Sequence, residues 1–360
     1  MSKTGTYSID FSLLAPVAIL VVLGLTTLFS VNIDFFKSQI IFLVFSVLAF
    51  LFFSRLNYKI IEYYAVPVYV ISLVLLFLIL IVGIESRGAV RWLEIAGFRI
   101  QFSEIFKPFL AIIFASFIAT REKLDAGVFL KTILFLLPVF LFIFLQPDLG
   151  NAIIYLFVVF LSLIILGFPI KYFVGAVLPG VLLLPLVLRF THGYQKQRIV
   201  TFLHPGADPL GTSYNAIQSI IAVGSGMFTG RGLGQGTQSG LRFLPERHTD
   251  FIFATLSEGL GFIGSILVIA AFIFLLYRIY VIFTRSSDKF SRTFAITAFF
   301  LILVQFFVNI GMNIGVLPIV GVTLPFVSYG GSSLLSSFIL LGMLSAVSRN
   351  VKREDVVEIR

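Results

Sequence analysis

Long apolar runs recur from one end of the chain to the other, and they restrict its fold more than any other feature. A helix that crosses the hydrocarbon core of a membrane needs about 20 mostly apolar residues. Ten segments meet this requirement, at roughly 10–31, 35–54, 60–84, 103–120, 130–145, 150–167, 169–190, 249–281, 291–315 and 329–348. Only 12% of the residues are charged, against about 25% in soluble domains. We therefore predict an all-α integral membrane protein with about ten transmembrane helices, in which residues 1–360 form one polytopic membrane domain.

The basic residues of the loops indicate the orientation, because cytoplasmic loops carry an excess of lysine and arginine. One side collects Lys3, Arg55, Lys59, Arg121, Lys123, Lys131, Lys171, Arg278, Arg285, Lys289, Arg292, Arg349, Lys352 and Arg353. The short turns at 147–149 and 316–328 on the other side carry none. Both termini are therefore predicted to be cytoplasmic, and residues 191–248 form one long extracellular loop between the seventh and eighth helices. The net charge of +9 then reflects topology, and we expect no nucleic acid as a partner.

The rarity of two residue types excludes several kinds of site. Cysteine is absent, so the chain has no disulfide, no thiolate nucleophile and no cysteine-bound metal. The three histidines, His192, His204 and His248, lack the helical spacing of a zinc site. We predict no metal ion bound directly by the protein.

The stretch from Arg242 to Gly261 changes within a few residues from a charged loop to an apolar helix. Asp250 stands at this change, and Glu258 follows inside the apolar run. A carboxyl group at Asp250 lies near the membrane surface, where a lipid head group can reach it. Because ionisable residues are costly in such places, a functional site is the default hypothesis.

Basic residues on the outer side suggest an anionic ligand, since they depart from the charge rule. The outer segments contain Arg87, Arg91, Arg99, Lys196, Arg198, Arg231, Arg242 and Arg247. The alternative is that long loops escape the rule. Within the fourth helix, Glu104 and Lys107 are three residues apart, so they share a face and can form an ion pair. This pair is either purely structural or places Lys107 against an anion.

Glycine, proline and small polar residues mark the remaining outer segments. Asp148, in the turn Gln146-Pro147-Asp148-Leu149-Gly150, can cap the next helix. The glycine-rich run 224–240 follows no strand and is not a nucleotide motif, and residues 214–223 are predicted as an interfacial helix. In the last outer turn, the run that contains Ser332 offers donors to a phosphate or else allows close helix packing.

These motifs, in this order, resemble the SEDS family (shape, elongation, division and sporulation proteins) from the first helix to the last. The resemblance rests on Arg91-Trp92-Leu93, Gln101-Phe102-Ser103-Glu104 with Lys107, Gln146 to Gly150, Arg198 to Pro205, Leu244-Pro245-Glu246, His248-Thr249-Asp250-Phe251, Leu324-Pro325 and Ser328-Tyr329-Gly330-Gly331-Ser332-Ser333. The chain departs from the family at Phe102, where proline is usual, and at Gly259, where a second glutamate is frequent.

The resemblance implies a peptidoglycan glycosyltransferase that polymerises lipid II on the outer face of the bacterial cytoplasmic membrane. The family's essential aspartate falls on Asp250, and its ion pair falls on Glu104 and Lys107. Glu246, His248 and Ser332 lie in matching motifs and are predicted to support the site. The resemblance also implies a class B penicillin-binding protein as partner, with other membrane proteins of the elongation complex. Gly236-Thr237-Gln238, Gln146-Pro147 and short termini favour the elongation and rod-shape branch over the division branch.

The chemistry of lipid II fits one carboxyl group and several cations. Its pyrophosphate is already a good leaving group, whereas the attacking sugar hydroxyl has a high pKa and needs a base. We assign Asp250 as that base and Lys107, Arg91 and Arg198 as candidates for binding the pyrophosphate. A single displacement on the α-linked donor gives a β-1,4 glycan with inversion. A divalent cation, Mg²⁺ or Mn²⁺, held through the pyrophosphate is compatible with this scheme.

Two other function classes stay open. Many helices with buried charges also describe a lipid II flippase or another transporter, although no inverted repeat is visible and the polar residues gather on the outer side. The second class is a scaffold without catalytic activity, which does not explain why the ionisable Asp250 lies at the membrane–water boundary.

Overall fold

The computed structural model describes residues 10–86, 89–95, 98–190, 193–204, 206, 208, 211 and 213–358. Lys3, Arg87, His192 and Pro205 lie outside these residues. The first half of the chain forms α1 (Phe11–Val31), α2 (Ile33–Arg55), α3 (Tyr58–Tyr63), α4 (Ala65–Val82), β1 (Ile84–Ser86), β2 (Ala89–Ile95), β3 (Phe98–Ile100), α5 (Phe102–Ala119), α6 (Ala126–Leu145) and α7 (Leu149–Ile165). The second half forms α8 (Ile170–Phe190), α9 (Gly193–Leu203), α10 (Tyr214–Ser225), α11 (Thr237–Gly240), α12 (Ile252–Arg285), α13 (Lys289–Asn313) and α14 (Gly331–Glu358).

The apolar runs form helices, as predicted, because backbone groups in a hydrocarbon medium must be paired within their own segment. Eight helices of the described residues are long and apolar enough to cross a membrane, and Leu149–Ile165 and Ile170–Pro179 are shorter apolar helices where the sixth and seventh spans were expected. The all-α membrane class is confirmed, and the number ten stays a prediction.

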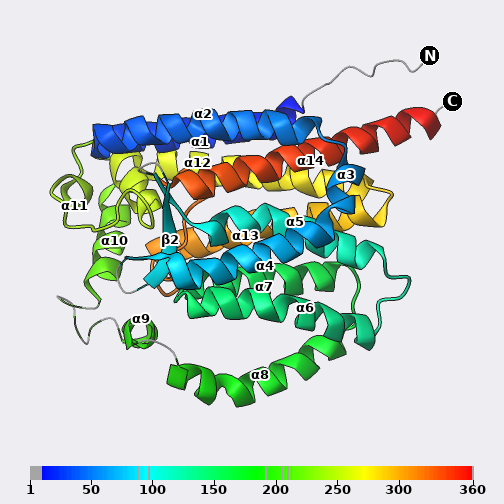
Figure 1. The fold of residues 1–360 in the computed structure, drawn as a ribbon. Helices are drawn as coiled ribbons and strands as arrows, with labels where there is room; N and C mark the ends of the chain where they lie inside the picture. Colours follow the sequence, from blue (N-terminus) through cyan, green and yellow to red (C-terminus); the bar gives the residue numbers. More distant parts are fainter. Residues whose placement is uncertain are drawn as a thin grey trace.

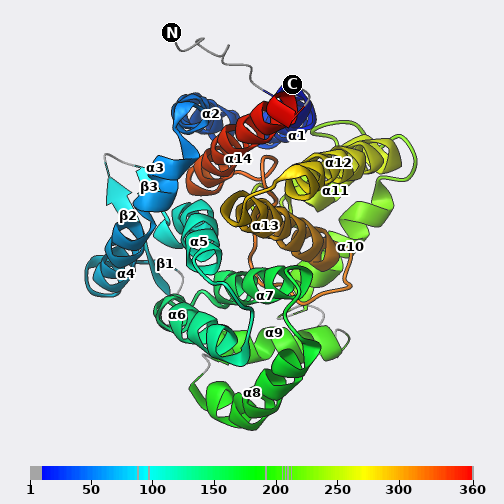
Figure 2. The ribbon, with the colours of Figure 1, turned by 90° about the vertical axis from the view of Figure 1, so that its right-hand side faces the viewer.

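The helices run side by side in one elongated bundle (Figure 1). Seen along the bundle, α13 lies in the middle, with α5, α7, α12 and α14 around it (Figure 2). In the apolar window of α14, 94% of the residues are buried, against 17% in α2. Glu104 and Lys107 therefore lie on a central helix, α5, whereas α2 turns Val44, Phe45 and Phe52 outward, as expected of a helix facing lipid.

The beginning of α1 and the end of α14 lie at the same end of the bundle (Figure 1). Asp10, which caps α1, lies 3.5 Å from Arg278 Nη2 of α12 and accepts a hydrogen bond from Ser348 Oγ of α14 (3.2 Å). The structure thus agrees with the prediction that the two termini share one side of the membrane.

A small antiparallel sheet, in the order β1-β2-β3, forms in the segment of Arg91 and Arg99, for which the sequence predicted only an outer position. Glu94 of β2 lies opposite Arg99 of β3 in the register. Hydropathy did not indicate these short strands, because a span of three to seven residues adds little to an apolar profile. The sheet leads directly into α5 and carries Arg91.

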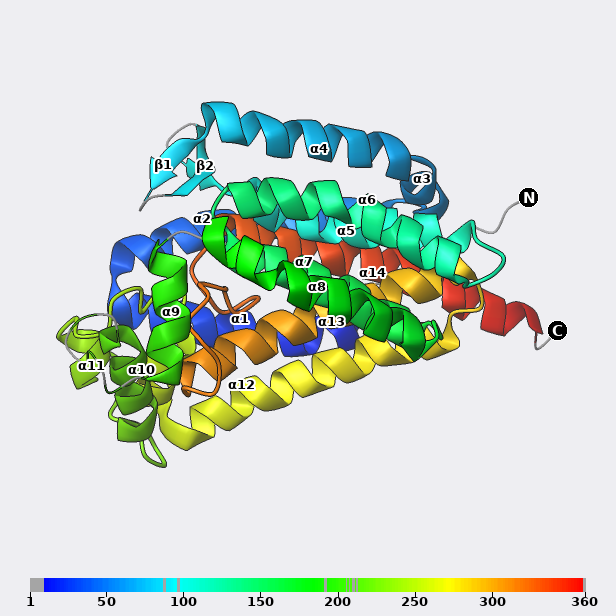
Figure 3. The ribbon, with the colours of Figure 1, turned by 90° about the horizontal axis from the view of Figure 1, so that it is seen from below.

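The long loop at 191–248 contains α9, α10 and α11, which gather at the end of the bundle opposite the C-terminal end of α14 (Figure 3). The helix predicted at 214–223 is confirmed as α10. Gly261 (φ 66°, ψ −157°) interrupts α12, and residues of the glycine-rich segment pair with the interruption. Close packing is thus one use of these glycines.

Candidate active site

A tight turn places Asp250 directly before α12. The backbone carbonyl of Glu246 accepts hydrogen bonds from the amides of Thr249 (3.1 Å) and Phe251 (3.2 Å). Glu246 has a φ of 50°, and its Oε2 accepts from Thr249 Oγ1 (3.0 Å). Glu246 therefore shapes the turn that presents Asp250, which fits the supporting role predicted for it.

His248 connects this turn to two other parts of the bundle. Its ring stacks on Phe35 of α2, with the ring centroids 4.1 Å apart and an interplanar angle of 11°. Its carbonyl accepts from the amide of Tyr329 (2.8 Å), in the loop before α14. His248 thus fixes the position of the turn relative to α2 and α14.

Two asparagines of α13 hold Asp250 from the other side. Asn309 Nδ2 and Asn313 Nδ2 each donate to the carbonyl of Asp250 (3.0 Å). Asn309 Nδ2 also donates to the carbonyl of Val322 (2.7 Å), and Asn313 Oδ1 accepts from the amide of Ala254 (3.1 Å). Both side chains are fully buried. They fasten the start of α12 to the loop between α13 and α14.

Asp250 and Arg198 come together around Gly321 of that loop. A Cβ atom built on Gly321 would lie 3.4 Å from Asp250 Oδ2 and 3.8 Å from Arg198 Nη1. Gly321 has a φ of +73°, which favours glycine. Asp250 is partly buried and Arg198 is exposed. A carboxyl group and a guanidinium from different parts of the sequence thus both lie close to Gly321.

Arg198 also lines a cavity of about 200 Å³ between α9, α10 and the turn after α13. One wall is polar and comes from α9, with Gln197, Arg198 and Thr201. The other walls are mostly apolar and consist of Phe202, Ala216, Ile220, Gly315, Leu317, Pro318 and Ile319. The cavity can accept a group that carries both polar and apolar surface, and Arg198 connects it to the surroundings of Gly321 and Asp250.

Lys107 lies in a second, buried polar cluster between α5, α7 and α13. Its Nζ donates to Glu104 Oε1 (2.7 Å), Glu104 Oε2 (2.8 Å) and Gln305 Oε1 (2.8 Å). Asn151 Nδ2 of α7 also donates to Glu104 Oε1 (2.9 Å). Lys107 is 2% exposed. The structure thus contains the ion pair predicted from the spacing and adds two amide partners.

Asp148 extends this cluster toward the small sheet. Its Oδ1 caps α7 by accepting from the amide of Asn151 (3.3 Å). Its Oδ2 accepts from Gln101 Nε2 (2.6 Å), Ser103 Oγ (3.0 Å) and Asn151 Nδ2 (2.9 Å), and Arg91 Nη1 lies 3.8 Å from Oδ1. The sequence indicated the cap but not the network. Amide and hydroxyl side chains inside apolar helices were the available signal.

Ser332, the second residue of α14, joins the buried cluster to the start of that helix. Its Oγ accepts from the amide of Gln101 (2.9 Å). The neighbouring Ser333 Oγ lies 2.8 Å from Thr323 Oγ1. The loop at 321–330 thus lies close to Asp250 and Arg198 at Gly321 and leads into α14, whose Ser332 contacts Gln101 at the edge of the buried cluster.

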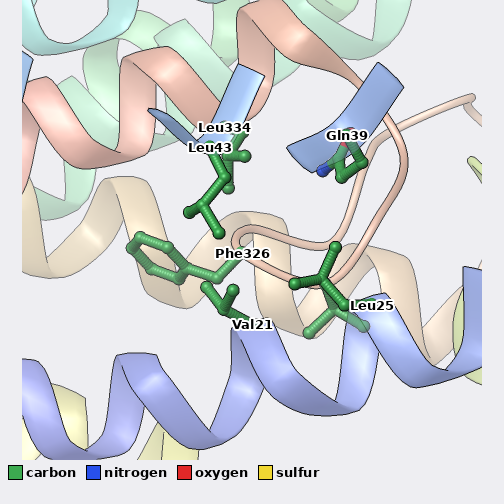
Figure 4. Close-up of a pocket in the computed structure, with 7 residues that line it drawn as sticks. Val21, Leu25, Gln39, Leu43, Phe326 and Leu334 are labelled. Atoms are coloured by element: carbon green, nitrogen blue, oxygen red, sulfur yellow. The ribbon is translucent and has the colours of Figure 1, made fainter. Parts of the chain in front are cut away.

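Gln39 of α2 fixes the same loop from outside. Its Nε2 donates to the carbonyl of Ser328 (3.1 Å), and its Oε1 accepts from the amide of Gly330 (3.2 Å). Figure 4 shows Gln39 beside the loop, with Leu43 and Leu334 nearby. This crevice leaves no room for a water molecule. It is a packing contact rather than a ligand site.

No group of three histidine, cysteine, aspartate or glutamate side chains gathers to hold a metal ion in the described part of the chain. A cation held through a ligand's pyrophosphate stays a prediction.

Arg247 lies outside the membrane-spanning helices. Its burial, and to a smaller extent the nearby positive charge of Arg242, lower the pKa of its guanidinium from the ordinary value.

A family model described as cell cycle protein, for FtsW, RodA and SpoVE, matches residues 7–353. The chain belongs to this SEDS family. The family predicted from the motifs is therefore confirmed.

Relatives of this SEDS protein include a probable peptidoglycan glycosyltransferase FtsW of Saccharophagus degradans, 35% identical over 98% of this chain and 96% of the relative. The peptidoglycan glycosyltransferase MrdB of Escherichia coli K12 is 40% identical over 82% of this chain and 80% of the relative. Among solved structures, a chain of a peptidoglycan synthase complex has a TM-score of 0.83 at 29% identity, covering 96% of this chain and 98% of that one. The rod shape determining protein RodA of Thermus thermophilus has a TM-score of 0.72 at 27% identity, covering 95% and 97%. The SEDS protein thus shares its fold with these proteins along nearly its whole length.

Proposed function

We propose that this SEDS protein is a peptidoglycan glycosyltransferase that joins lipid II disaccharide units into β-1,4 glycan strands on the outer face of the bacterial cytoplasmic membrane. The observation that carries the proposal is the meeting of Asp250 and Arg198 around Gly321, beside a cavity at the end of the bundle opposite the termini. The names of the relatives support the reaction class.

In the proposed reaction, the 4-hydroxyl of the acceptor sugar attacks the anomeric carbon of the lipid-linked donor. Asp250 takes the hydroxyl proton as the new C–O bond forms, and the bond from the anomeric carbon to the pyrophosphate oxygen breaks with its electrons. The lipid pyrophosphate leaves, and the configuration changes from α to β. One base is sufficient, because the leaving group needs positive charge rather than a proton.

Arg198 lies where it can neutralise charge that develops beside Asp250. Lys107 and Arg91 carry charge in and beside the buried polar cluster, as candidates for a lipid pyrophosphate. Fixed charges in a site with little water stabilise a transition state far more than they would in water. A divalent cation bound through the pyrophosphate would add to this charge, with the pyrophosphate oxygens as its ligands.

We also propose the elongation role, with a class B penicillin-binding protein as partner. The 40% identity to MrdB and the motif Gly236-Thr237-Gln238 support elongation, while the FtsW relatives favour division. A chain of similar fold in a complex described as coordinating polymerization and crosslinking supports a transpeptidase partner.

The test compares the wild-type protein with Asp250→Asn, using purified lipid II in detergent with and without the partner transpeptidase. Because general-base assistance contributes about 10²–10⁴ in rate, we expect at least a 100-fold loss of glycan polymer in a variant that still folds. Asp208→Asn, at an exposed aspartate of the loop at 191–248, should keep its activity. Full turnover by Asp250→Asn would refute the assignment. Lack of polymer from the wild type, with partner and Mg²⁺ or Mn²⁺ present, would favour a lipid II flippase.

A further inference from the structure

Glu258 is a buried carboxyl group that the proposed reaction does not use. It lies in α12, eight residues after Asp250, and none of it is exposed. Its Oε1 accepts from the amide of Gln238 (2.8 Å), and its Oε2 accepts from the amide of Ser239 (2.9 Å). Burial of such a group is unfavourable unless its oxygens are hydrogen-bonded. Both oxygens are used to hold α11.

The fit between Glu258 and α11 depends on a glycine. A Cβ atom on Gly236, directly before α11, would overlap the carboxyl carbon of Glu258. Thr237 Oγ1 lies 3.5 Å from Oε1 as a weaker third donor. The sequence around α11 is thus shaped to receive this carboxyl group.

The backbone around Glu258 is bonded to the glycine-rich segment as well. The interruption at Gly261 leaves carbonyl and amide groups without partners inside the helix. The carbonyls of Glu258 and Gly259 accept from the amides of Arg231 (2.9 Å) and Gly232 (3.0 Å). In return, the amides of Phe262 and Ile263 donate to the carbonyls of Met227 (2.9 Å) and Phe228 (3.3 Å). Residues 227–232 of the glycine-rich segment are therefore hydrogen-bonded to α12 at residues 258–263.

From α11, contacts lead to the turn that carries Asp250. The carbonyl of Ser239 accepts a hydrogen bond from Arg247 Nη1, and the carbonyl of Gln238 accepts from the amide of Leu244 (3.0 Å). The carbonyl of Arg247 accepts from Thr255 Oγ1 (2.9 Å). Arg247 stands three residues before Asp250. The two amides that Glu258 binds thus belong to residues whose carbonyls hold the loop before Asp250.

We propose that Glu258 is a positioning residue for Asp250, acting through α11 and Arg247. The carboxyl group fixes Gln238 and Ser239, Ser239 fixes Arg247, and Arg247 sets the turn. This inference rests on the proposed function, because it takes Asp250 to be the catalytic base. Glu258 itself touches no substrate in this scheme.

The first test is Glu258→Gln, which keeps the shape but turns an amide NH₂ toward an amide donor. We expect kcat to fall by up to about 100-fold, the effect of a misplacement of about 1 Å, with KM changed by less than about twofold because the substrate contacts remain. Glu122→Gln, at an exposed glutamate in the loop between α5 and α6, is the matched control and should leave kcat unchanged.

The second test is Arg247→Met, alone and combined with Glu258→Gln. Because both residues act along one path, we expect the double variant to lose little more than either single variant, since interacting residues are not additive. Losses that multiply, or a Glu258→Gln variant with normal kcat, would overturn the proposal. If Glu258→Gln does not fold, Arg247→Met still decides it: a fall in kcat at constant KM supports the path, and a normal kcat refutes it.

Hydrogen exchange gives a readout that does not depend on catalysis. In Glu258→Gln we expect faster amide exchange in residues 237–250 than in the wild type, with α13 and α14 unchanged. Unchanged exchange in residues 237–250 would refute the positioning role, even in an active enzyme. If the wild type makes no polymer but Glu258→Gln still shows the faster exchange, only the proposed function is refuted.

Discussion

At the scale of single residues, three carboxyl groups have different surroundings. Asp250 is partly buried near Arg198, whereas Glu104 is paired with Lys107 and Glu258 accepts hydrogen bonds from backbone amides. The sequence singled out Asp250, because it stands where a polar loop becomes apolar. It could not distinguish a carboxyl group close to an arginine side chain from one that holds backbone amides, since that depends on residues far away in the chain.

Gly321 provides a test of the space around Asp250. In Gly321→Ala, a methyl group would stand in contact with Asp250 Oδ2 and Arg198 Nη1, and a left-handed backbone costs about 1–2 kcal/mol for other residues. We expect polymer synthesis to fall at least tenfold while the protein stays folded. The measurement is glycan formation from lipid II, together with thermal unfolding in detergent.

Gly167 is the matched control for this substitution. It also has a positive φ (+95°), but a Cβ atom there would meet nothing within 4 Å. Gly167→Ala should therefore cost similar stability and keep its activity. Equal activity losses in the two variants would show that backbone strain, and not the space beside Asp250, causes the effect.

At the scale of elements, hydropathy predicted the helices because each apolar run is long, and it missed features that depend on pairing. The sheet at 84–100 consists of strands of three to seven residues. Predicted span 60–84 is divided into α3 and α4 at Tyr64. The interruption of α12 at Gly261 could not be inferred from one glycine, since its freed backbone groups are satisfied by residues 227–232, about 30 positions earlier.

The pair Glu104–Lys107 connects α5 to α7 and α13, so its role can be tested as a contact between elements. In Glu104→Gln the charge of Lys107 loses its carboxyl partner, and breaking a buried pair in this way costs about 3–5 kcal/mol. We expect a clear loss of thermal stability. In Glu104→Gln/Lys107→Met both charges are gone, and we expect much of the stability to return while glycan formation stays about 10²–10³ below the wild type.

Activity of the double variant decides between the two roles of the pair. Recovery of both stability and polymer synthesis would mean that the pair only orients the helices. Recovery of stability alone would mean that the positive charge of Lys107 acts on the substrate. The side-chain amides of Asn151 and Gln305, which contact the pair, are unchanged in both variants, so the two variants differ only at the pair itself.

At the scale of the whole molecule, the charge pattern and the fold give the same division into two ends. The sheet and α9 to α11 lie at one end, and the beginning of α1 and the end of α14 lie at the other (Figure 1). Asp250 lies near Arg198 of α9, since both are close to Gly321. The sequence predicted this division from loop charges alone, because lysine and arginine are retained on the cytoplasmic side during insertion. The contents of the long loop at 191–248 were harder to predict, because α10 and α11 pack on α12 and are too short to span a membrane.

The natural absence of cysteine allows this orientation to be measured without background labelling. Lys196→Cys places a thiol on the exposed surface of α9, and Lys123→Cys places one in the exposed loop between α5 and α6. We expect a membrane-impermeant maleimide to label Lys196→Cys in intact spheroplasts and Lys123→Cys only after permeabilisation, because loops rich in lysine and arginine stay inside. The opposite pattern would put Asp250 in the cytoplasm, where lipid II is made but not polymerised, and the proposed function would then fail together with the orientation.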